Sequence, residues 1–97
     1  MSNDKAEEYM DEGNGCLALG ELDEAVTHYR KAVEVAPDFY DGWHALAMGL
    51  MKLKRLEEAE KAGLELLRLE PNNEMGYTTM SLIYVRMDRI KDAEAMG

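Results

Sequence analysis

The chain has 97 residues, a net charge of −9 and a single cysteine. Nucleic acid and anionic membrane surfaces are disfavoured as partners, because both are bound by clustered lysine and arginine side chains. One cysteine excludes a disulfide framework, and the polar N-terminal stretch lacks the apolar core of a signal peptide, so we expect a cytoplasmic protein.

Residues 6–39 carry the pattern of two helices joined by a tight turn. Apolar residues recur at spacings of three and four along both halves, which is the spacing of one helix face. Gly20 stands where the chain must reverse, and Pro37 ends the second helix because the residue before a proline avoids helical geometry. Residues 1–39 hold ten acids and three bases, so a neutral or basic partner is favoured at this end.

Residues 40–73 repeat the same pattern at an offset of 34 positions. Trp43 aligns with Tyr9, and Pro71 aligns with Pro37. An offset that is kept along a whole segment predicts structural units that stack on one another.

The start of this second unit has a helix-start signal. Asp38 precedes Asp41 by three residues, a spacing that predicts a side-chain cap and places an acid in the first turn of the next helix. We therefore expect Asp38 to cap that helix.

Residues 74–97 begin a third unit but do not complete it. Tyr77 and Ala93 continue the register of 34, yet only seven residues follow Ile90. Isolated helices this short are marginal in water. We expect a truncated third unit whose second helix, beginning at Ile90, is a stub.

The three units resemble the tetratricopeptide repeat, a 34-residue pattern of aromatic, small and proline positions. The resemblance implies an all-α fold, an α-solenoid of antiparallel helix hairpins, with one domain over 1–97 divided at 6–39, 40–73 and 74–97. It also implies a non-catalytic module that binds another polypeptide. The positions that carry it are Tyr9, Gly13, Ala25, Tyr29 and Pro37, then Trp43, Leu46, Ala47, Ala59 and Pro71, then Tyr77, Met80, Ser81 and Tyr84.

In this family the inner helix of each hairpin faces a concave groove, which here would be rich in methionine. Flexible thioethers suit an apolar or amphipathic peptide or helix, because they repack around different side chains. The alternative that stays open is that the methionines are covered by a C-terminal segment of the chain or by a second copy. The residues we expect to line the groove are Met10, Asn14, Leu17, His44, Ala45, Met48, Met51, Lys52, Met75, Thr79, Leu82 and Arg86.

Some family members hold a partner's C-terminal carboxylates with Lys, Asn and Arg on their inner helices. Asn14 alone fits that set. The other positions hold Met10, Ala45, Met75 and Thr79, which carry no positive charge. We therefore do not expect recognition of an Hsp70 or Hsp90 tail.

Residues with catalytic or metal-binding chemistry are few. Cys16, His28 and His44 are not arranged with a base, a nucleophile or a metal ligand at a useful spacing. Cys16 falls at the core aromatic position of the repeat, where we expect it to be a small, buried apolar filler. We expect no enzyme activity, no metal and no cofactor.

The incomplete third unit leaves Met80, Tyr84 and Met87 partly uncovered, whereas repeat arrays normally end in a polar cap. A homodimer through this open C-terminal end is therefore expected. The alternative is that the chain is an excised regulatory or targeting segment of a larger enzyme or of a secretion-type machine.

Overall fold

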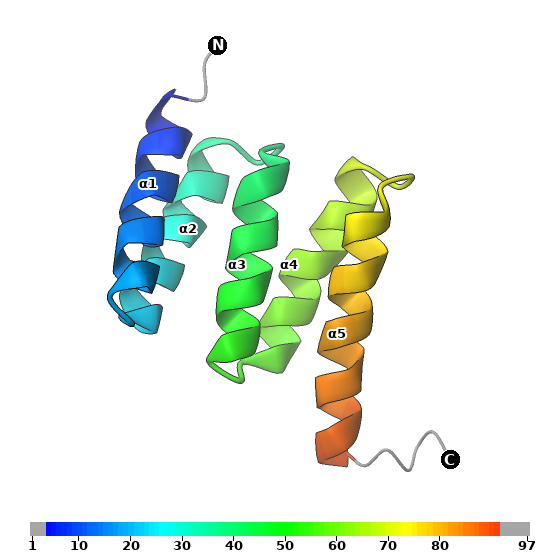
Figure 1. Ribbon diagram of the computed structural model, residues 1–97. Helices are drawn as coiled ribbons and strands as arrows, with labels where there is room; N and C mark the ends of the chain where they lie inside the picture. Colours follow the sequence, from blue (N-terminus) through cyan, green and yellow to red (C-terminus); the bar gives the residue numbers. More distant parts are fainter. Residues whose placement is uncertain (1–3, 92–97) are drawn as a thin grey trace.

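The computed structural model describes the backbone of residues 4–91 and the side chains of residues 4–88, which form five α-helices joined by short turns (Figure 1). Within this range there is no strand, and no helix is long and apolar enough to cross a membrane. The fold is the expected all-α solenoid. The helices are α1 (Asp4–Ala18), α2 (Leu22–Val35), α3 (Tyr40–Lys52), α4 (Leu56–Leu69) and α5 (Glu74–Lys91).

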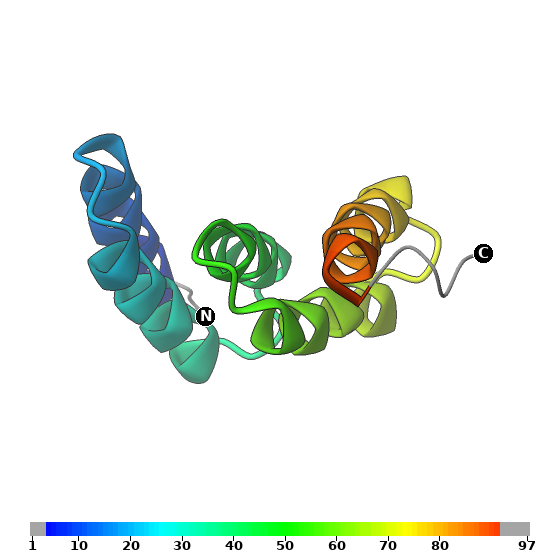
Figure 2. The ribbon, with the colours of Figure 1, turned by 90° about the horizontal axis from the view of Figure 1, so that it is seen from below.

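The helices form two layers. Figure 2 shows α1, α3 and α5 side by side in one layer and α2 and α4 in the other. The closest packing is within the pairs α1 with α2 and α3 with α4, and α5 packs against α4 and α3. The inner helices of the repeat therefore share one face of the molecule.

The turns inside the two hairpins each contain a residue with left-handed backbone geometry. Gly20 has φ +80° and Lys54 has φ +67°, a region that side chains other than glycine adopt at a cost. The corresponding residue of the third unit, Asp88, lies within α5. The expectation of a separate helix beginning at Ile90 is therefore wrong, because α5 continues past that residue. The rest of the expected stub, residues 92–97, lies outside the described residues.

The turns between the units are tied to aromatic side chains of the following helix. The Trp43 indole Nε1 donates a 2.7 Å hydrogen bond to the carbonyl oxygen of Pro37. One repeat later, the Tyr77 hydroxyl donates a 3.0 Å bond to the carbonyl oxygen of Pro71. The hydrogen bond from an aromatic side chain to the proline carbonyl oxygen therefore recurs at the period of 34.

The cap predicted at the start of α3 does not form. The N-cap residue is Phe39, and no side chain caps the helix. At the start of α5, by contrast, the Asn73 carboxamide oxygen accepts a 2.9 Å bond from the amide of Met75, as an N-cap side chain does. Asp38 is left in the turn, one residue before the N-cap.

The main apolar core is built by α2, α3, α4 and α5, and a second, smaller cluster consists of Ala6, Ala32 and Ala36. Tyr29, Leu50 and Ile83 are among the fully buried side chains of the main core. Met80 is only 4% exposed, so the expectation that the incomplete third unit leaves it partly uncovered is wrong; it occupies the space that a side chain at Gly63 would fill. Gly63 is therefore matched by a large side chain from α5, which brings α4 and α5 close together.

Candidate functional site

A hollow of about 180 Å³ lies between α1 and α3, and we call it the α1–α3 pocket. Six of its lining residues are ones that the sequence predicted for the groove. Residues three or four apart share one face of a helix, which explains why the two helices present them together. The pocket is lined by Asn14, Leu17, Tyr29, His44, Ala45, Met48, Gly49 and Lys52.

Tyr29 reaches this pocket from the outer layer. Its hydroxyl donates a 2.7 Å hydrogen bond to Oδ1 of Asn14, which leaves Nδ2 of Asn14 as the donor for a ligand. Burial raises the pKa of the Tyr29 phenol, with a smaller contribution from Cys16. The phenol is thus held in its protonated, donating form.

Two of the predicted groove residues are buried in the core instead. Met51 is 3% exposed and Thr79 is 2% exposed, so their predicted placement on an accessible surface is wrong. Met51 follows Ala47 by one helical turn, and Thr79 precedes Ile83 by one turn. Ala47 and Ile83 are fully buried. Met51 and Thr79 each lie four residues from one of them, on the same helix face, and are therefore buried as well.

The remaining predicted residues lie outside the α1–α3 pocket. Met10 is half-buried and packs against the core. Leu82, Arg86 and Met75 are exposed on α5. Met75 lines a different hollow, so the predicted surface does not form one continuous cavity.

That second hollow measures about 400 Å³, and we call it the acidic pocket. It lies where the turns before α3 and α5 meet the first residues of those helices. Of its lining residues only Met75 was expected in the groove, and a pocket at these turns was not predicted; the acids that flank Pro37 and Pro71 were the available signal. It is lined by Asp38, Phe39, Tyr40, Asp41, Glu70, Asn73 and Met75.

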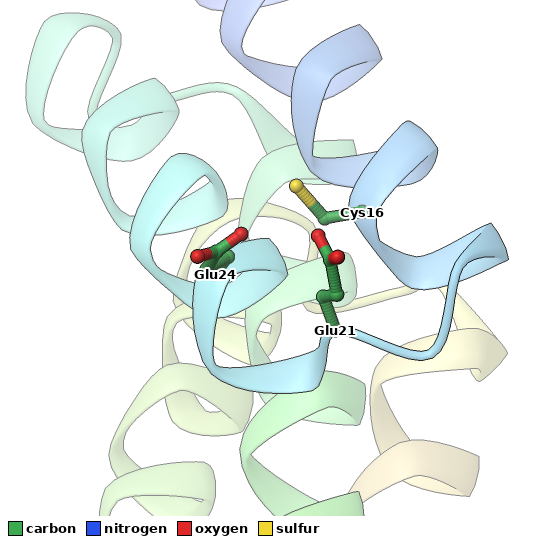
Figure 3. A group of neighbouring side chains, drawn as sticks. All are labelled: Cys16, Glu21 and Glu24. Atoms are coloured by element: carbon green, nitrogen blue, oxygen red, sulfur yellow. The ribbon is translucent and has the colours of Figure 1, made fainter.

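A third group lies where α1 ends and α2 begins (Figure 3). The Cys16 sulfur and carboxylate oxygens of Glu21 and Glu24 lie within 4.8 Å of one another. Burial raises the pKa of the Cys16 thiol, and Glu21, Glu24 and Glu12 raise it further. A protonated thiol is a poor nucleophile and a poor metal ligand. Cys16 packs half-buried against the core.

The two histidines occupy different settings. His44 lines the α1–α3 pocket. His28 lies on the other layer, where its Nδ1 is 3.2 Å from a carboxylate oxygen of Glu12. Neither belongs to the group around Cys16.

Comparison with known repeats agrees with this arrangement. The chain matches the TPR repeat over residues 13–48 and the tetratricopeptide repeat over residues 40–73.

Among curated relatives, it is 36% identical over 66 residues to Protein STIP1 homolog of Dictyostelium discoideum and 29% identical over 85 residues to anaphase-promoting complex subunit 3 of Schizosaccharomyces pombe. These matches cover 68% and 88% of the chain, but only 12% and 13% of those proteins. The protein MJ0572 of Methanocaldococcus jannaschii is 33% identical over 66 residues, which are 68% of the chain and 77% of that protein.

Solved structures of the same fold are more distant in sequence. A double mutant of MamA, the second TPR of Spaghetti (RPAP3) bound to an HSP90 peptide, and the TPR domain of Arabidopsis OM64 each superpose with a TM-score of 0.81 at 19% identity. They cover 91%, 96% and 97% of the chain, and the chain covers 49%, 86% and 78% of them. The two repeat matches and the relative that is matched over most of its length show that the chain belongs to the tetratricopeptide repeat family.

Proposed function

We propose that the chain is a non-catalytic module that binds a segment of another polypeptide across α1 and α3. The observation that carries the proposal is the α1–α3 pocket, which is lined by the apolar side chains of Leu17, Ala45 and Met48 together with the polar side chains of Asn14 and Lys52. A cavity of about 150 Å³ accommodates a benzene-sized group. A pocket of about 180 Å³ is therefore suited to one apolar side chain of a partner.

The compared proteins support a polypeptide ligand. Members of this family are typically interaction modules, and the second TPR of Spaghetti was solved with a peptide of HSP90. Because the chain spans about an eighth of STIP1 homolog and of the anaphase-promoting complex subunit, the activities of those whole proteins are not transferred to it. A role as a regulatory or targeting segment within a larger protein remains the alternative form of this proposal.

Placing a charge in the α1–α3 pocket is expected to weaken binding. A random dodecapeptide library displayed on phage, selected against the chain, supplies the probe peptides. Met48→Lys is expected to weaken their binding by at least about tenfold, which corresponds to 1.4 kcal/mol, because the ammonium group would be desolvated by an apolar ligand. Affinity is measured by fluorescence anisotropy.

The matched control is Leu64→Lys, which adds the same charge at an exposed position of α4. Helix content is checked by circular dichroism for both variants. Equal affinity of Met48→Lys and the unmodified chain, with the fold retained, would refute binding at this pocket.

We also propose that the chain self-associates through α5. Tyr77 and Val85 are 54% and 57% exposed, and Leu82 and Tyr84 of the same helix are 42% and 43% exposed. Several large apolar side chains left exposed on one helix make that helix a candidate for a protein interface. The occupant we propose is a second copy of the chain, which carries the same exposed apolar side chains on its own α5.

Light scattering over a concentration range tests this second proposal. The mass is expected to rise from the 11.0 kDa of one chain toward twice that value, and Val85→Lys is expected to shift the equilibrium toward the monomer. Leu19→Lys, in an exposed turn, is the control and should leave the mass unchanged. A strict monomer at high micromolar concentration would exclude the dimer.

A further inference from the structure

One face of α3 joins the two pockets. Asp41, Ala45, Met48 and Lys52 follow one another at spacings of four, three and four residues, so their side chains share that face. Asp41 lines the acidic pocket, and the other three line the α1–α3 pocket. At a rise of 1.5 Å per residue, Asp41 and Met48 are about 10 Å apart along the helix. A single bound segment can therefore reach both pockets.

The acidic pocket has no cation of its own among the described side chains. None of Asp38, Asp41 and Glu70 forms an ion pair with a described residue. Glu70 accepts a 2.8 Å hydrogen bond from Nδ2 of Asn73, which is neutral, and Asp38 does not cap α3. The pocket thus presents negative charge that the described part of the chain does not neutralise.

Tyr40 lies in the same pocket, and that charge affects the pKa of its phenol. Its hydroxyl oxygen is buried and makes no hydrogen bond with a described group. Burial raises the pKa of the Tyr40 phenol, and Glu70 and Asp41 raise it further. The Tyr40 phenol, which forms part of the pocket wall, therefore lies in the negative potential of these carboxylates.

The size and the spacing of the acids decide which cation fits. Carboxylates that hold a single metal ion must converge, as the ligand atoms of Cys16, Glu21 and Glu24 do within 4.8 Å. Asp38, Asp41 and Glu70 form no such group, and their pocket measures about 400 Å³. A long basic side chain fits this space better than an ion does.

The walls of the pocket suit the stem of such a side chain. Phe39, Tyr40 and Met75 supply apolar surface beside the carboxylates. Arginine and lysine bury their methylene stems along apolar surface while the charged head meets its partner. Arginine has the additional advantage of a planar fork of donors that can engage more than one carboxylate.

We propose that this surface binds a polypeptide segment with an arginine or lysine in the acidic pocket and an apolar side chain in the α1–α3 pocket, about 10 Å away. The inference rests on the proposed peptide-binding function and names its ligand chemistry. Lys52 lies beyond Met48 at the opposite end of the face and repels a second basic residue there. The segment is therefore bound in one direction, with its basic end toward Asp41.

Peptides from the same dodecapeptide library test the ligand chemistry. Selection against the unmodified chain is expected to enrich arginine and lysine and to deplete aspartate and glutamate. The strongest peptide is then synthesised with its enriched basic residue replaced by methionine, which keeps the apolar stem and removes the charge. We expect the affinity to fall by about tenfold, with a smaller difference at 0.5 M salt because screening weakens partly exposed charge pairs.

Variants of the chain test whether the basic residue of the peptide binds in the acidic pocket. Asp41→Asn combined with Glu70→Gln is expected to weaken the basic peptide by about tenfold and the methionine peptide by less than about twofold, as a coupled pair requires. Glu34→Gln combined with Glu57→Gln removes the same charge from exposed positions of α2 and α4 and should change neither affinity.

Three results would overturn the inference: enrichment of acidic peptides, enrichment without charge preference, or an equal effect of the control pair. If the affinity of the peptides falls with Met48→Lys but is unchanged by Asp41→Asn combined with Glu70→Gln, the proposed ligand chemistry is wrong while the proposed function stands. If no peptide is enriched, both fail.

Discussion

Replacing Tyr29 with alanine is expected to lower the free energy of unfolding by about 3–5 kcal/mol, the usual range for truncating a buried aromatic side chain. Tyr29 is 2% exposed and is the largest fully buried side chain among the described residues. Its ring packs so closely on α1 that a Cβ added to Gly13 would lie 2.5 Å from it. Urea denaturation followed by circular dichroism measures the change.

Tyr29→Phe separates the packing of the ring from its hydrogen bond. It keeps the ring and removes only the bond to Asn14, so a loss of about 0.5–1.5 kcal/mol is expected. A loss below about 1 kcal/mol for the alanine variant is incompatible with the core position of Tyr29, because truncating a buried aromatic ring leaves a cavity.

Met51→Lys is expected to cost about 3–5 kcal/mol, the penalty of an uncompensated buried charge. Met51 is 3% exposed and packs with the core. Met48 is only half-buried at the α1–α3 pocket, so a lysine there can extend its ammonium group into water and should cost less than about 1 kcal/mol. The same urea titration compares the two variants.

This pair is a matched test, because the residue change is identical and the positions are three apart on one helix. Similar stability of the two variants would contradict the assignment of Met51 to the core. The difference also decides which variant can report on binding, since only Met48→Lys is expected to leave the fold intact.

The repeat period predicted most of the fold. It located the helices of the first two units and the repeat position Ala47, which is fully buried, because these positions are set by packing between neighbouring units. It could not separate Met48 from Met51. The width of the buried face depends on how closely α3 approaches its neighbours, and a single-chain pattern does not contain that distance.

The repeat period did not predict the acidic pocket either, for a different physical reason. Asp38 and Glu70 are 32 positions apart in the sequence and belong to separate turns. Local rules assigned Asp38 to a helix cap, a role that the chain does not use. Only the stacking of one unit on the next brings the two carboxylates to one hollow.

The bond from the Trp43 indole to the carbonyl oxygen of Pro37 gives the chain an optical reporter at a defined place. Trp43 is its single tryptophan, and this bond ties the indole to the turn where one hairpin joins the next. Indole emission therefore follows the joint between the hairpins, while far-ultraviolet ellipticity follows the helices themselves. In a stacked array, whose stability divides into units and the contacts between them, these two signals distinguish parting of the hairpins from melting of the helices.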